Sequence, residues 1–292
     1  MPDASPRGPD QPSSQPPPRP PDQPSSQPSG PPSSEFGESG DSPDSGATPV
    51  SITPRRAQAP IPPERDDYSG EFTPDFRYED LSKPALVRLV REFAQAVHLL
   101  DRSMCAAIGI SHGGAEVQRL AIEEWRGASP VYGERLREIM NIEGDGVSAI
   151  FKVLQLDPGF PHHYLDVRYE LIDESHGFFE LAYCGALMDA EPWGEKMVTS
   201  MCHHIEDGTF DYTAQAVNPK AHIKHVHRPP RVPSDQSPHC RWEITIDEDN
   251  ETVPEADITK IVRGTTAATF KYPPMRDGTP HIPTKHSIES GR

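Results

Sequence analysis

The sequence predicts an α+β domain in which helices are followed by a β-β-α-β-β unit with an antiparallel sheet. Two patterns lead to this prediction. Apolar residues recur every three or four positions between about residues 82 and 158, which is typical of helices with one apolar face. From residue 165 apolar and charged residues alternate instead, which is typical of half-buried strands. A run of helices followed by a run of strands indicates the α+β class.

Four helices are expected in the helical part of the domain, residues 71–158. Ser82 and Pro84 form a start signal for the first, which is a long amphipathic helix. Its apolar stripe consists of Leu86, Leu89, Val90, Phe93, Val97 and Leu100. The other three helices are expected over residues 115–127, 131–140 and 147–154, with Ser129 and Pro130 as the cap of the third.

The sheet part of the domain, residues 159–247, is expected to hold four strands and one helix. The strands are expected over residues 165–171, 178–184, 221–228 and 240–247, and the helix from residue 193 to about 216. In the third strand, alternation puts His225 and His227 on the apolar face, and in the fourth strand it does the same for Cys240. We therefore expect Cys240 to lie roughly across from His227.

Residues 1–70 and 248–292 are expected to be disordered tails on either side of a single domain over residues 71–247. The first tail holds 19 of the 35 prolines, and the octamer Pro-Asp-Gln-Pro-Ser-Ser-Gln-Pro occurs in it twice. Such a composition cannot bury enough apolar surface to offset the backbone entropy of ordering, which costs about 1–2 kcal/mol per residue. The second tail returns to proline, threonine, aspartate and glycine without sustained periodicity.

Charge and hydropathy narrow the classes of partner. The net charge of −17 weighs against nucleic acid, because phosphate binding draws on clustered lysine and arginine. No run approaches the roughly 18 apolar residues that a membrane span needs, and the first residues lack the basic and apolar regions of a signal peptide. We therefore expect a cytoplasmic protein that binds a small-molecule substrate, with no nucleic acid and no membrane as partner. Assembly into a homo-oligomer is compatible with the sequence.

Cysteines and histidines of the sheet part predict a metal site. The expected ligands are Cys184, Cys202, His225 and Cys240, which fall on four successive elements. Zinc selects thiolates and imidazoles, and an iron-sulfur cluster is the alternative. Glu206 lies one helical turn after Cys202, so Glu206 or His227 is expected to transfer the proton as general base. Each cysteine has an equally good alternative role as a packed core residue.

A further pattern in the C-terminal half is the order of its cysteines and prolines. It runs Cys184, Cys202, Asn218-Pro219, His225 four residues before Pro229-Pro230, and Cys240-Arg241-Trp242-Glu243. This order resembles a group of bacterial and archaeal proteins related to L-2-amino-thiazoline-4-carboxylic acid hydrolase, over roughly residues 78–247. The resemblance implies helices followed by a mixed sheet, and hydrolytic opening of a small ring that contains a C=N bond. One departure is His225, which stands where the group tends to have a cysteine.

Two functions follow from these expectations. In the first, the ion activates water, and the protein is a metal-dependent hydrolase that cleaves a C=N or amide bond in a small molecule. In the second, four protein ligands saturate zinc or an iron-sulfur cluster, and the domain is a ligand-sensing or structural module without turnover. An open coordination position beside a base favours catalysis, whereas four closed protein ligands favour the structural role.

Overall fold

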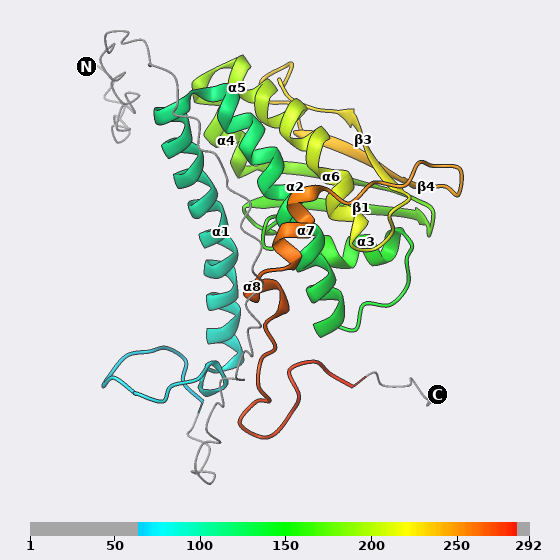
Figure 1. The fold of residues 1–292 in the computed structure, drawn as a ribbon. Coiled ribbons are helices and arrows are strands. Elements are labelled where there is room, and N and C mark those ends of the chain that lie inside the picture. The colour runs from blue at the N-terminus through cyan, green and yellow to red at the C-terminus, as the bar shows by residue number, and fades with distance from the viewer. Residues whose placement is uncertain (1–63, 285–292) are drawn as a thin grey trace, which may run out of the picture. The chain divides into compact units, whose positions relative to one another are not determined.

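The computed structural model describes residues 64–284 and confirms the predicted α+β class. Helices α2 and α6 lie over one face of a sheet whose strands are all antiparallel to their neighbours (Figure 1). Residues 1–63 and 285–292, which include most of the predicted N-terminal tail and the end of the C-terminal one, lie outside the described residues.

The helical part begins where its start signal predicts. It consists of η1 (Tyr78–Asp80), α1 (Lys83–His112), α2 (Gly114–Ile139) and α3 (Val147–Leu154). Ser82 caps α1, because its Oγ accepts a hydrogen bond from the N–H of Ala85 at 3.3 Å. The chain turns between α1 and α2 at Gly113, whose φ of 86° is a conformation that favours glycine. In residues 64–284, no helix is long and apolar enough to cross a membrane.

The apolar stripe that predicts α1 packs into the domain only in part, with Leu86, Leu89 and Val97 half-buried. Phe93 and Leu100 are 49% and 72% exposed, whereas His98 and Asp101 on another side of the helix are only 6% and 5% exposed. The polar side can be buried because its groups find partners. His98 Nε2–H donates to the carbonyl of Gly159 at 3.1 Å, and Asp101 forms an ion pair with the next residue along the helix.

Helix α2 continues through Pro130, where the sequence predicts a boundary between two helices. Proline has no N–H, so the carbonyl of Arg126, four residues earlier, loses its helical partner. Thr259 of α7 (Asp257–Arg263) replaces that partner, because its Oγ1 donates to the Arg126 carbonyl at 2.8 Å. The prediction of separate helices over 115–127 and 131–140 is therefore wrong, and the reason is a side chain more than a hundred residues away.

The segment after residue 248 also differs from the sequence prediction. In its described part it forms α7 and α8 (Thr266–Thr269) instead of a disordered tail. Helix α7 packs closely on α2 at Gly127, where an added Cβ would lie 3.0 Å from Ile258 Cγ1. Arg263 of α7 pairs with Glu134 of α2 at 2.6 Å. These helices have seven and four residues, too few for a recognisable helical period in the sequence.

The predicted helix from residue 193 to about 216 is confirmed as one uninterrupted helical run, which consists of α5 (Glu195–Thr199), the π-helical segment η3 (Ser200–Ile205) and α6 (Glu206–Gln215). Two short elements that the sequence analysis does not predict, α4 (Gly185–Ala190) and η2 (Glu191–Trp193), come before it. Cys184 caps α4 by accepting a hydrogen bond at Sγ from the N–H of Leu187 at 3.3 Å. Gly194, with a φ of 89°, separates η2 from α5. Single π-helical turns occur frequently at functional sites.

The sheet has the strand order β1-β2-β4-β3. Its strands are β1 (Leu165–Asp173), β2 (His176–Cys184), β3 (Ala221–His227) and β4 (Cys240–Ile246), close to the predicted ranges. On the covered face, Phe179 and Trp242 stack with ring centroids 6.4 Å apart. Phe210 of α6 contacts both rings edge-on, which fastens the helix to the sheet.

The opposite face of the sheet carries ion pairs that connect neighbouring strands. Arg241 of β4 donates to Glu180 of β2 at 2.9 Å and to Glu170 of β1 at 2.5 Å. Strand β1 lies at one edge of the sheet, and its Asp166 and Arg168 side chains are exposed and pair with each other at 3.1 Å. The alternation of charged and apolar residues that predicts β1 therefore reflects one covered face and one open face.

The register of the last two strands differs from the expected one. His225 pairs with Trp242, but an irregularity follows, so that His227 pairs with Arg241. Cys240 instead pairs with Leu181 of β2. The expectation that Cys240 lies across from His227 is wrong, because simple alternation does not anticipate a bulge at the end of β3.

We expect Thr259→Val to lower the free energy of unfolding by about 1–3 kcal/mol, since it leaves the buried Arg126 carbonyl without a donor. Chemical denaturation measures this change. Thr266→Val, at an exposed position of α8, is the control and is expected to change stability by less than about 0.5 kcal/mol.

A Pro130→Ala background tests the cause of that loss. The alanine supplies an N–H to the same carbonyl, so we expect Thr259→Val to cost clearly less in this background than in the wild type. An equal loss in both backgrounds would contradict the role assigned to Thr259.

Candidate functional site

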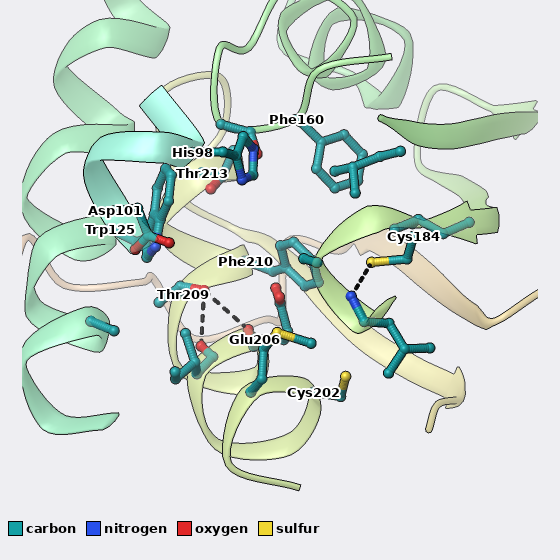
Figure 2. Close-up of a pocket in the computed structure, with 18 of the residues that line it drawn as sticks. His98, Asp101, Trp125, Phe160, Cys184, Cys202, Glu206, Thr209, Phe210 and Thr213 are labelled. Atoms are coloured by element: carbon teal, nitrogen blue, oxygen red, sulfur yellow. Dashed lines mark hydrogen bonds between the residues drawn. The ribbon is translucent and has the colours of Figure 1, made fainter. Parts of the chain in front are cut away.

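A cavity of about 140 Å³ lies between the helices and the covered face of the sheet. Its walls come from α1, α2, the sheet and the η3–α6 segment. Helix α1 contributes His98, Asp101, Arg102 and Cys105, and α2 contributes Ala121, Trp125, Ser129 and Tyr132. The sheet and the η3–α6 segment close the other sides with Leu181, Trp242, Cys202, Glu206, Thr209, Phe210 and Thr213. Figure 2 shows His98, Asp101 and Trp125 on one side of this space and Cys184 and Cys202 on the other.

Four of the six predicted site residues line this cavity. Cys184 ends β2, Cys202 lies in η3, Glu206 begins α6 and Cys240 begins β4. Burial raises the pKa of Cys184 and of Cys240 to about 12, and it raises the pKa of Cys202 further. The Glu206 carboxylate adds to each shift, so the thiols are held in the neutral form.

The two predicted histidines lie outside the cavity. The His225 side chain is 44% exposed, and its Nδ1 lies 3.6 Å from the Asp207 carboxylate. His227 Nε2 is 3.1 Å from the carbonyl of Pro238. The structure therefore does not bring His225 together with the three thiols, nor His227 together with Glu206.

The residues predicted to bind a metal do not form a metal site in the described part of the chain. In residues 64–284, no three histidine, cysteine, aspartate or glutamate side chains form a group that could hold a metal ion. The residues as arranged do not fit zinc or an iron-sulfur cluster. Both stay predictions of the sequence, and elemental analysis of the purified protein beside Cys202→Ala and Cys240→Ala would test them.

Glu206 is a titratable group with unusual surroundings. Its carboxylate makes no hydrogen bond or ion pair with any described residue, and Figure 2 shows it beside Phe210. Burial raises the pKa of Glu206 to about 7; Asp207 and Asp101 contribute to the increase, and Arg102 opposes it. A carboxyl with such a pKa is present in both protonation states at neutral pH and can accept or release a proton there.

Arg102 is held between two acidic groups at the wall next to Glu206. It forms an ion pair with Asp101, and its Nε donates to Asp189 Oδ2 at 3.3 Å. Tyr164 donates to the same Asp189 oxygen at 2.8 Å. The guanidinium is therefore fixed in position, and its field reaches Glu206 without a direct contact.

A second group of polar side chains lines the end of the cavity near His98, and the sequence analysis does not identify it. Tyr132 donates to Asp157 Oδ2 at 3.1 Å, and Ser129 Oγ lies 3.1 Å from the Tyr132 hydroxyl. Asp157 Oδ1 accepts from the N–H of Gly159 at 2.7 Å. Burial raises the pKa of Asp157 to about 6.

The residues from α1 could have been found from their spacing. His98, Asp101, Arg102 and Cys105 stand at positions i, i+3, i+4 and i+7, which is one face of a helix. A stripe of polar residues usually indicates the solvated face of a helix. The neighbouring apolar stripe is therefore predicted to be the packed face. Asp157 and Gly159 belong to a turn, whose contact with α1 no local pattern shows.

The comparisons with known proteins add no relative: no family model matches the chain, and no curated protein or solved structure matches it either.

The raised pKa of Glu206 has a measurable effect on stability. Between the ordinary pKa of 4.5 and the folded value of about 7, the folded chain keeps a proton that the unfolded chain has released. Stability therefore falls as the pH rises through this window, by roughly 3 kcal/mol at full extent. We expect Glu206→Gln to raise the free energy of unfolding by about that amount at pH 8 and to change it little at pH 4.

Chemical denaturation at the two pH values measures this difference. Glu195→Gln, at an exposed position of α5, is the matched control and is expected to have little effect at either pH. Loss of stability in Glu206→Gln at pH 8 would show that the carboxylate is stabilised in the fold, contrary to this account.

Proposed function

We propose that the protein is a hydrolase that cleaves a C=N or amide bond in a small molecule, with Glu206 as the general acid and base. The observation that carries this proposal is the unpaired carboxyl of Glu206 in the cavity, with a pKa of about 7. Strongly shifted carboxyl groups in cavities are typical of groups that transfer protons. The resemblance to the thiazoline-carboxylate hydrolase group supports the choice of bond.

The size of the cavity supports a compact substrate. A volume of about 140 Å³ is close to the roughly 150 Å³ of an engineered protein cavity that holds benzene. One five- or six-membered ring with small substituents therefore fits. Its aromatic walls, which include Trp125, Phe160 and Phe210, suit a flat ring.

The proposed reaction uses Glu206 both as base and as acid. The carboxylate first accepts a proton from a water molecule while the water oxygen bonds to the carbon of the C=N or amide group, and the π electron pair moves onto the nitrogen or oxygen. In an amide, the C=O bond then re-forms as the C–N bond breaks, and the protonated Glu206 gives its proton to the departing nitrogen. In a C=N substrate, Glu206 first returns the proton to the nitrogen of the tetrahedral intermediate. Its carboxylate then takes the hydroxyl proton as the C=O bond forms and the C–N bond breaks, and it passes this proton to the departing nitrogen. A pKa near 7 suits both roles at neutral pH.

The thiols have a different part in this proposal. Because burial holds Cys184, Cys202 and Cys240 in the neutral form, they are poor nucleophiles. They form a weakly polar wall that excludes water from the side of the cavity opposite α1. Such a wall helps to keep the pKa of Glu206 high.

The alternative is a ligand-binding or structural module, with or without zinc or an iron-sulfur cluster, in which no bond is broken. The same cavity would then hold its ligand unchanged. Turnover distinguishes the two functions, because binding alone leaves the ligand chemically intact.

We expect the purified protein to hydrolyse 2-amino-thiazoline-4-carboxylate or a related cyclic amidine, and Glu206→Gln to lower kcat at least about 100-fold, as loss of a general base does. In the wild type, kcat is expected to rise as the pH rises through about 7 and then to level off, since each turnover starts from the carboxylate form of Glu206. Product formation followed by chromatography measures both effects.

Glu195→Gln again serves as the control and is expected to keep the wild-type rate. Hydrolysis that persists in Glu206→Gln would remove Glu206 from the reaction. Tight binding of the same compounds without product would favour the ligand-binding module.

A further inference from the structure

The end of the cavity near His98 holds a buried hydrogen-bond acceptor that the fold leaves unused. His98 is 6% exposed, and its Nε2–H donates to the carbonyl of Gly159 at 3.1 Å. This bond fixes the tautomer, so Nδ1 carries a lone pair. In residues 64–284, Nδ1 is the one side-chain nitrogen or oxygen of a residue lining the cavity that is both fully removed from solvent and without a hydrogen-bond partner; the Glu206 carboxylate also lacks a partner but is not fully removed from solvent.

The other polar groups at this end already have partners within the protein. Ser129, Tyr132 and Asp157 form a chain of hydrogen bonds that ends at the N–H of Gly159. The same glycine supplies the carbonyl that orients the His98 ring. The chain therefore positions the imidazole and leaves Nδ1 as the acceptor at this end that has no partner within the protein.

The charge state of His98 keeps this acceptor available. Burial lowers the pKa of His98, and the positive charge of Arg102 on the next turn of α1 lowers it further. Asp101 and Asp189 act in the opposite direction but do not reverse the shift. The imidazole thus stays neutral at neutral pH, and Nδ1 accepts a hydrogen bond instead of donating one.

Leaving a buried acceptor without a partner is unfavourable, and native proteins rarely do so. The aromatic side chains of Trp125 and Phe160 line the same cavity, so the space beside the imidazole suits a flat ring. We propose that His98 Nδ1 is a recognition subsite for an O–H or N–H donor on a planar ring bound in the cavity. This inference rests on the proposed function only in taking the cavity as the substrate site.

Two small probes test this subsite without any turnover. Phenol and benzene have nearly the same shape, but only phenol carries a donor. We expect both to bind, and we expect His98→Gln to weaken phenol about tenfold relative to benzene, the effect of losing one hydrogen bond. Titration followed by calorimetry or by NMR measures the ratio of the two Kd values.

The two amide variants of His98 are matched to separate its two nitrogens. Glutamine can keep a donor near the Nε2 position and so the bond to Gly159, whereas asparagine places its amide oxygen near the Nδ1 position. We expect His98→Asn to keep the ratio within about twofold of the wild-type value. An unchanged ratio in His98→Gln, or binding of neither probe to the wild type, would overturn the proposal.

A measurement on the wild type covers the case in which neither variant folds. In ¹⁵N-labelled protein, phenol is expected to move the His98 Nδ1 resonance toward that of a hydrogen-bonded nitrogen, and benzene is expected to leave it in place. Equal responses to both probes would overturn the subsite. Glu195→Gln, outside the cavity, is the control and is expected to leave the phenol-to-benzene ratio unchanged. Neither probe is hydrolysed, so the ratio tests the subsite and product formation tests the hydrolase, and failure of one proposal does not change the result for the other.

Discussion

The wall of the cavity depends on one helix remaining continuous through a proline. Trp125 precedes Pro130 on α2 and Tyr132 follows it, yet both line the same space. A helix that ended at the proline would point these side chains in unrelated directions. The hydroxyl of Thr259 satisfies the carbonyl that the proline leaves free, so a short C-terminal helix helps to determine the shape of a site to which it contributes no lining residue.

The second constraint is electrostatic. Among the described residues that line the cavity, Arg102 is the one lysine or arginine, and it is already paired with Asp101 and Asp189. The thiols and Glu206 must therefore be accommodated without a counterion of their own, and removal from water favours the neutral form of each. Two opposing influences, burial and the distant guanidinium, together hold the carboxyl between its charged and neutral forms.

Local patterns predict the four strands, α3 and the start of α1, because each depends on residues close in sequence. They also identify Glu206, since its spacing from Cys202 follows from helix geometry. The continuity of α2, the buried face of α1 and the register of β3 depend instead on contacts between segments that are distant in the sequence. From the sequence, Pro130 predicts a helix boundary, but in the structure Thr259 donates to the carbonyl that the proline leaves without a partner, and the helix continues. The polar stripe of α1 likewise predicts a solvated face, but in the structure His98 is buried and donates to the Gly159 carbonyl. A bulge that no composition signals moves His227 out of the expected register.

The charged outer side of β1 has a consequence for how these molecules behave when crowded together. An edge strand offers unpaired backbone groups to which a strand of another molecule can add, and a flat apolar edge begins aggregation in this way. Here the exposed Asp166 and Arg168 side chains stand along that edge, and the register of β1 with β2 shifts after Asp166. A strand that added to β1 would have to place its own side chains directly beside these charges, so growth of the sheet beyond β1 is disfavoured.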